Sequence, residues 1–210
     1  VMLDNFNGYG GDNNQTENLV YINDQLFQLE KRNEKLYIKT YGNTQKGSVK
    51  LKKGMQVVTQ AAHDVNADIL VLQMGSNGGW DSYDELIAQY QAMIEKSGTQ
   101  CYIIIGDTDN PTEAYDSEQY ESDIEVGTKD NVWETALREA FGEHFINMRA
   151  FMIEYGLETA GLDPTEQDLD DLANGRVPEQ LKDDYTHFNS YGYYAMGAAV
   201  YQKGVELGYW

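Results

Sequence analysis

Two short polar stretches combine residue types and spacings that suit acid–base chemistry. The first is Asp184-Tyr185-Thr186-His187, a loop that holds one of only three histidines in the chain. In a turn, a three-residue spacing lets the carboxylate of Asp184 reach the imidazole Nδ1–H, which fixes the tautomer and leaves Nε2 as a base. The loop predicts His187 as a general base oriented by Asp184. The alternative is a loop that merely happens to hold a histidine.

The second stretch is GSNGGW at residues 75–80, directly after the apolar run ADILVLQM. The side-chain amide of Asn77 is suited to donate a hydrogen bond to an oxyanion, and the glycines let backbone approach a ligand closely. Taken alone, a plain glycine-rich turn is the simpler explanation of this stretch. Because the stretch follows an expected strand, Asn77 is a candidate hydrogen-bond donor to an oxyanion.

The elements that must position these residues alternate between strand and helix patterns. Continuous apolar runs that end in glycine are typical of strands buried on both faces, and apolar residues at helical spacing predict helices. Strands are expected at residues 67–75, 101–108 and 144–151, and helices at 82–98, 131–142, 163–175 and 190–210. This alternation predicts an α/β fold with a parallel sheet covered on both faces, in which function collects at the carboxyl ends of the strands.

Two further segments carry local signals. The helix expected over 163–175 has Asp163 as its N-cap, Pro164 in its first turn and Glu166 completing a capping box, and Gly175 ends it. Residues 18–60 instead consist of short β-branched or aromatic runs broken by Asn, Asp and Gly, which predicts a small antiparallel β appendage.

Length and charge narrow the classes of partner. The 210 residues fit one domain, large enough to need no disulfide or metal. A net charge of −20 repels nucleic-acid phosphates and anionic membranes, and no apolar run approaches the ~20 residues of a membrane span. The acidic stretches 107–125 and 163–171 lack the spacing of an EF-hand loop, and solvated surfaces explain them more simply. We therefore expect no nucleic acid, membrane, metal or organic cofactor, and we expect Cys101 to be a structural thiol.

The two polar stretches, taken in this order, resemble the SGNH (GDSL-type) serine esterase and lipase superfamily. Its motifs include G-x-N after a buried strand and D-x-x-H before the final helix, and the resemblance to a bacterial branch covers most of residues 18–210. It implies one domain over 1–210 with a flavodoxin-like three-layer α/β/α sheet and a β-rich insertion at 18–60. It also implies that His187 is the general base, Asp184 its orienting acid and Asn77 an oxyanion-hole donor, while His63 and His144 are ordinary residues.

A third motif of the superfamily has a partial match near the start of the chain. Residues 7–12, NGYGGD, resemble its N-x-G-x-G-G-[DE] pattern, which implies that the backbone N–H of Gly11 is a second oxyanion donor. A glycine-rich loop leading into the β appendage explains these residues equally well.

The nucleophile of the superfamily is the serine of a Gly-Asp-Ser motif on a central strand, and these 210 residues contain no such motif. Either a segment or chain outside this sequence supplies that strand, or VMLDNFN takes its place, with Asp4 and Asn5 where Asp and Ser belong. The leading hypothesis is a serine hydrolase that acts through an acyl-enzyme on small ester or acyl groups, including those of carbohydrate esters. The alternative is a non-catalytic SGNH-like binding module that has lost its serine.

Overall fold

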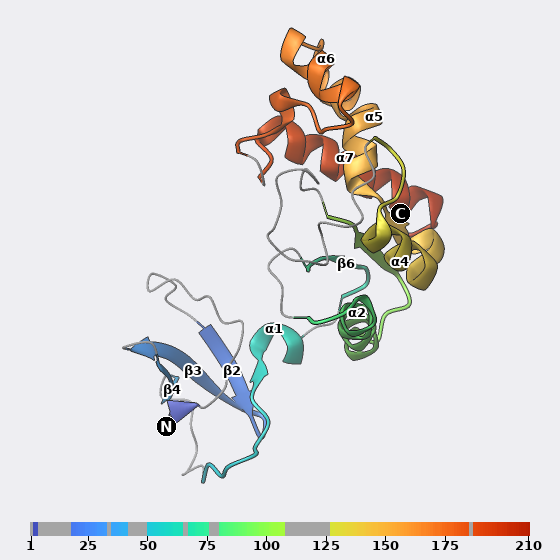
Figure 1. The fold of residues 1–210 in the computed structure, drawn as a ribbon. Coiled ribbons are helices and arrows are strands. Elements are labelled where there is room, and N and C mark those ends of the chain that lie inside the picture. Colours follow the sequence, from blue (N-terminus) through green and yellow to red (C-terminus); the bar gives the residue numbers. More distant parts are fainter. Residues whose placement is uncertain are drawn as a thin grey trace. The chain divides into compact units, whose positions relative to one another are not determined.

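A computed structural model gives the fold of the chain (Figure 1). The chain divides into two compact units, residues 1–67 and residues 68–210. The structure describes residues 2–3, 18–32, 35–41, 50–64, 67–75, 80–107, 127–184 and 187–210.

The first unit is built on an antiparallel sheet with the strand order β1-β4-β3-β2-β5 (Figure 1). Asn23 and Asp24 join β2 to β3 in a tight turn, and both have positive φ, as the favoured two-residue hairpin turns require. The antiparallel sheet expected from the sequence is therefore confirmed. Its elements are β1 (Met2–Leu3), β2 (Asn18–Ile22), β3 (Gln25–Arg32), β4 (Lys35–Thr40), β5 (Val58–Thr59) and the short helix α1 (Gln60–His63).

The core of this unit follows from strand periodicity. Val20 and Ile22 alternate along β2, and Phe27 and Leu29 alternate along β3, so the four side chains share one face of the sheet. All four are buried. Leu19 and Tyr21 of β2, and Leu26 and Gln28 of β3, point to the opposite face.

The strand β1 decides one of the alternatives raised by the sequence. Met2 pairs with Tyr37 and Leu3 with Leu36, both antiparallel. The idea that VMLDNFN occupies a central place in the parallel sheet is therefore wrong for Met2–Leu3, which belong to the antiparallel sheet. The rest of that segment lies outside the described residues.

The second unit holds a parallel sheet with the strand order β6-β7-β8. Leu70 pairs with Tyr102, and Ile104 with Phe145. The mixed α/β class is therefore confirmed, with a parallel sheet and a separate antiparallel one. The elements are β6 (Leu70–Gln73), α2 (Tyr83–Ser97), β7 (Tyr102–Ile105), α4 (Val132–Phe141), η1 (Gly142–His144), β8 (Phe145–Ile146), α5 (Met148–Ala160), α6 (Glu166–Ala173), η2 (Glu179–Leu181) and α7 (Ser190–Glu206).

Helices cover both faces of this sheet. One apolar cluster joins β7 and β8 to α2 and α4, and a second joins the opposite face to α5 and α7, which lie side by side (Figure 1). Successive residues of β7 supply the two clusters: Ile104 belongs to the first, and Ile103 and Ile105 belong to the second. All three are buried because a central strand is covered twice.

The strand β6 is less covered than the sequence predicts. Val71 pairs in register with Ile103, yet Val71 is 42% exposed and Ile103 is 0% exposed. Gln73, the register partner of Ile105, is exposed as well. Among the described strands β6 lies at the edge of the sheet, and the layer of α5 and α7 leaves this side of it open. The expectation of a strand buried on both faces is therefore wrong for β6.

The third strand is also shorter than predicted. Residues 144–151 were expected to be extended, but β8 covers Phe145–Ile146 alone, and α5 begins at Met148. Asn147 is the cause, because its side chain accepts a hydrogen bond from the backbone N–H of Ala150 and caps the helix. The asparagine before this apolar run is the sequence feature that could have predicted the start of the helix.

The helix α6 is capped two residues later than predicted. Thr165, not Asp163, is the N-cap, and Asp168, not Glu166, completes the capping box. Asp168 is buried and also accepts hydrogen bonds from the backbone N–H and side-chain amide of Gln180. The tertiary contact with Gln180 therefore selects one of two locally possible caps. Gly175 follows the end of the helix with a φ of 66°, in line with its expected role.

Candidate functional site

His187 and Asp184 form one hydrogen-bonded unit in the loop before α7. The imidazole Nδ1 lies 3.0 Å from Oδ1 and 2.9 Å from Oδ2 of Asp184. The backbone N–H of His187 donates to the same Oδ1 at 2.7 Å, so the carboxylate holds both the main chain and the ring. The two side chains are 65% and 48% exposed. A proton on Nδ1 makes Nε2 the basic nitrogen of the ring.

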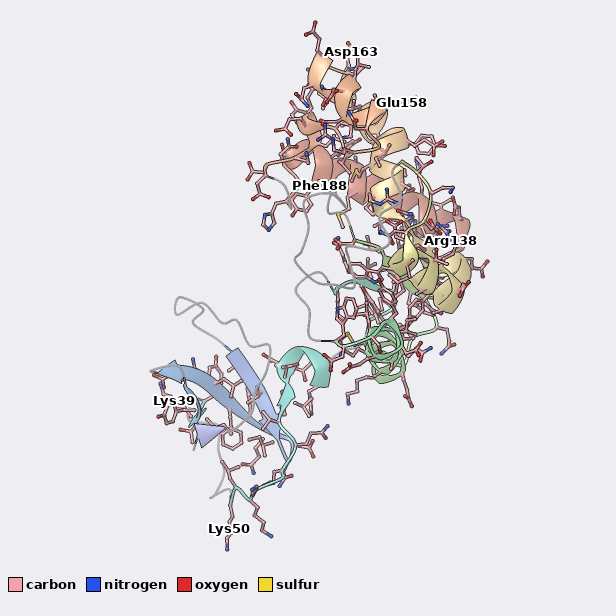
Figure 2. All side chains as sticks on the ribbon, in the orientation of Figure 1. Lys39, Lys50, Arg138, Glu158, Asp163 and Phe188 are labelled. Atoms are coloured by element: carbon pink, nitrogen blue, oxygen red, sulfur yellow. The ribbon has the colours of Figure 1, made fainter. Side chains whose placement is uncertain are left out.

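The backbone around this pair is clamped on both sides. Lys182 and Phe188 form an antiparallel bridge, and the N–H of Asp183 donates to the carbonyl of His187 at 2.8 Å. Phe188 (labelled in Figure 2) is only 6% exposed and packs into the core shared by α5 and α7. A buried anchor directly after His187 therefore fixes where the exposed imidazole stands.

The start of α7 is tied to the same loop. Asn189 caps the helix through the backbone N–H groups of Tyr191 and Gly192, and its amide donates to the carbonyls of Gln180 and Lys182. Gly192 touches the loop so closely that a Cβ would lie 2.2 Å from the carbonyl oxygen of Leu181. The loop and the first turn of α7 thus form one packed piece.

The two stems that flank residues 76–79, which are Met74–Gly75 and Trp80, have defined contacts. At the first stem, the hydroxyl of Tyr90 donates to the carbonyl of Met74 at 2.7 Å and accepts from the N–H of Met74 at 2.8 Å. Gly75 has a φ of 117°, and a Cβ there would meet the ring of Trp133 at 2.7 Å. At the second stem, the indole of Trp80 donates to the carbonyl of Gly75 at 2.8 Å. This hydrogen bond joins the two stems.

Two of the four predicted site residues fall outside the described part of the chain. Asn77 lies in residues 76–79 and Gly11 in residues 4–17, and neither stretch is described. The structure therefore brings Asp184 and His187 together, and the positions of Asn77 and Gly11 as oxyanion donors stay predictions.

One acidic residue at a strand end was not singled out from the sequence. Gly106 and Asp107 follow β7, and the N–H of Gly106 donates to the carbonyl of Ile146 at 2.9 Å. Burial raises the pKa of Tyr90 to about 12, and the negative charge of Asp107 adds to this rise against the hydrogen bond with Met74. Asp107 is therefore one of the charges that act on the hydroxyl of Tyr90. Its position directly after a buried strand is the sequence feature that could have identified Asp107 as a candidate site residue.

The other two histidines have well-defined partners too. His63 contacts Asp64 through Nδ1 at 2.7 Å, its Nε2 lies 3.6 Å from Asp24, and its ring stacks on Tyr21. His144 lies with Nδ1 3.0 Å from the carbonyl of Tyr102 and 2.9 Å from the hydroxyl of Tyr209. The sequence did not predict the contact between His63 and Asp64.

A buried ion pair orders the chain before α4. Arg149 donates to both carboxylate oxygens of Glu134 and to the carbonyls of Gly127 and Lys129. Both charged side chains are only 2% exposed. A charge buried in this way is stable only when it is fully hydrogen-bonded, so the pair holds residues 127–129 against α4 and α5.

Other potential sites are limited within the described ranges. No group of three or more His, Cys, Asp or Glu side chains there is arranged to hold a metal ion. A cavity of about 340 Å³ opens between α4, α5 and α7, and neither His187 nor Asp184 lines it. In the same described residues, no helix is both long enough and apolar enough to cross a membrane.

No family model, curated protein or solved structure matches the chain.

Proposed function

We propose that this chain carries the acid–base half of a serine hydrolase site that acts on small ester or acyl groups, including those of carbohydrate esters. The observation that carries the proposal is the contact between the Nδ1 of His187 and both carboxylate oxygens of Asp184, in a loop fixed by Phe188 and Asn189. An exposed imidazole oriented through Nδ1 is the arrangement that a general base needs.

In this mechanism Nε2 of His187 takes the proton of a serine hydroxyl as its oxygen attacks the ester carbonyl. The negative charge that develops on the carbonyl oxygen is held by the amide of Asn77 and the backbone N–H of Gly11. His187 then returns the proton to the departing alcohol, which leaves an acyl-serine. Water, deprotonated by the same nitrogen, releases the acid and restores the serine.

We further propose that the unit of residues 68–210 belongs to a larger flavodoxin-like α/β/α sheet of the SGNH type. The open side of β6 supports this, because Val71 is 42% exposed where its register partner Ile103 is fully buried. A neighbouring strand with its helix, carrying Gly-Asp-Ser, would cover that side. A segment or chain outside these 210 residues would supply it.

A second candidate function is a binding module of the same fold without catalysis. The absence of a Gly-Asp-Ser sequence from the 210 residues favours it. The two candidates share the fold and the ligand class and differ in covalent chemistry, so a probe for an activated serine separates them.

The test measures nitrophenyl acetate hydrolysis and labelling by a fluorophosphonate probe. It uses the 210-residue chain and the chain extended upstream along its coding sequence, each with a His187→Ala control. We expect the 210 residues to be no faster than their control and unlabelled. The extended chain should hydrolyse the ester and be labelled on one serine, and both results should depend on His187 and Asp184.

If the extended chain is also inert, the binding module is the better function. His187-dependent turnover by the 210 residues alone would mean that a serine within them, such as Ser76 or Ser190, attacks.

A further inference from the structure

The cavity between α4, α5 and α7 is separate from the loop that holds His187. Its volume of about 340 Å³ lies at the lower end of the ~300–1,000 Å³ of small-molecule sites. Residues of β8 contribute to its wall, and neither His187 nor Asp184 does. A ligand bound in this cavity would therefore occupy a site that the proposed hydrolase reaction does not use.

One part of the lining is apolar and aromatic. Phe151 and Tyr155 lie one turn apart on α5, and their ring centroids are 5.7 Å apart. Tyr155 is 46% exposed. A pyranose ring, which carries C–H groups on its faces, can pack against such an aromatic wall. The other apolar lining residues are Phe145, Ile146, Ala150 and Ala199.

The polar side chains of the lining keep hydrogen-bonding capacity for a ligand. Arg138 (labelled in Figure 2) donates to the carboxylate of Asp130 through Nε and Nη2, which leaves the two N–H groups of Nη1. Glu154 accepts from the hydroxyl of Tyr155 through Oε1 at 2.7 Å, which leaves Oε2 as an acceptor. The side-chain amide of Gln202 adds donors and an acceptor. The cavity thus presents both kinds of hydrogen-bonding group.

The charges of the lining cancel. Arg138 and Lys203 are basic, Glu154 and Glu206 are acidic, and Lys203 donates to Glu206 at 2.6 Å. An ion gains little net attraction from such a lining, whereas a hydroxyl group both donates and accepts, and so can use all of these side chains. We propose that this cavity binds an uncharged sugar ring, with hydroxyls on the polar side chains and a C–H face on the aromatic wall. Such binding needs neither His187 nor a Gly-Asp-Ser segment.

The first test is an NMR titration of the nitrogen-15-labelled 210-residue chain with glucose, galactose, xylose, N-acetylglucosamine and cellobiose. We expect saturable binding of at least one sugar with a Kd on the order of millimolar, because one or two rings make few contacts. Sorbitol has hydroxyls but no ring face, and phenylalanine is an aromatic zwitterion, so neither should bind. Lack of saturable binding by all of these sugars, or equally tight binding of sorbitol or phenylalanine, overturns the proposal.

The second test locates the sugar that binds most tightly. The largest shift changes should fall on the side-chain amide of Gln202 and the backbone N–H of Ala150, because α7 and α5 bring these two residues to the same cavity. Shift changes confined to residues 187–190 would place the sugar at the proposed hydrolase site instead and overturn the proposal.

Variants of the aromatic wall provide the third test. Tyr155→Ala should raise the Kd of that sugar at least about tenfold, and Tyr155→Phe, which keeps the ring, should change it by less than about threefold. Tyr191→Ala is the matched control, since Tyr191 is 51% exposed on α7 and does not line the cavity, and it should leave the Kd unchanged. A Kd insensitive to Tyr155→Ala overturns the proposal.

Discussion

His187 and His63 both meet a nearby aspartate through Nδ1, yet the surroundings of the two pairs differ. His63 has Asp64 at Nδ1, at 2.7 Å, and Asp24 at 3.6 Å from Nε2, and its ring stacks on Tyr21 with centroids 3.7 Å apart. His187 faces both oxygens of one carboxylate, that of Asp184.

The comparison shows that a hydrogen bond between a histidine and an aspartate is not enough to identify a general base, because the surroundings of the ring also matter. In the first unit both nitrogens of His63 face carboxylates and one face of the ring is covered by Tyr21, an arrangement that suits packing of α1 on β2. In the second unit the loop around His187 is anchored by buried Phe188, and the carboxylate of Asp184 contacts Nδ1 of the ring with both oxygens. The second arrangement suits proton transfer.

The largest effect we expect is on catalysis, and it sharpens this contrast. In a chain extended by a segment that carries Gly-Asp-Ser, His187→Ala should lower kcat for nitrophenyl acetate by about 10⁶-fold, because no other group takes the serine proton. His63→Ala is the matched variant and should change kcat by less than about twofold. Steady-state kinetics of the two variants provide the measurement. An equal loss of kcat in both variants would contradict the proposal that His187, and not His63, is the general base.

A smaller effect concerns the packed piece behind His187. Gly192→Ala should lower the free energy of unfolding by about 2 kcal/mol, because its Cβ would lie 2.2 Å from the backbone oxygen of Leu181. Gly197→Ala, in the same helix but with nothing within 4 Å of a Cβ, should raise it by about 0.5–1 kcal/mol. Urea unfolding of both variants provides the measurement. Equal effects would show that the loop does not pack on α7 as described.

The smallest effect concerns the pair in the first unit. The hydrogen bond from His63 holds the pKa of Asp64 below its usual value. A lowered carboxyl pKa contributes stability above the ordinary carboxyl range, near ~3.9, which is lost as pH falls through the folded pKa. His63→Ala should therefore raise the pKa of Asp64 in a carbon-13 NMR titration. The pKa of Asp130, lowered chiefly by its hydrogen bond with Arg138, should not move. A fixed pKa for Asp64 would show that the His63 contact is absent in solution.

Features that depend on neighbours in the chain were readable from the sequence. The helices α2 and α4 lie within a residue of their expected positions, because Ser82 and Asn131 cap them and apolar residues recur at helical spacing. The contact between Asp184 and His187 was also readable, because a three-residue turn brings the two side chains together wherever it stands in the fold. Asn147 carried the same kind of local signal for α5, but the apolar residues after it also fit a strand.

Features that depend on which elements meet in space were not readable. The run that forms β6 identifies a strand but not the number of its neighbours, so the exposure of Val71 was missed. Asp24 reaches the Nε2 of His63 because the turn between β2 and β3 and the helix α1 come together, and no spacing in the sequence encodes that approach.

The sequence by itself determined the strand and helix alternation, the separate antiparallel sheet and the local turn that joins Asp184 to His187, because short-range sterics and hydrogen bonds fix these within a few residues. Only the tertiary structure decided that Thr165 rather than Asp163 caps α6, that Met2–Leu3 joins the antiparallel sheet and that one side of β6 is open. Each of these depends on a partner far away in the chain. The free energy that selects them comes from burial and hydrogen bonding between elements that the linear order does not bring together.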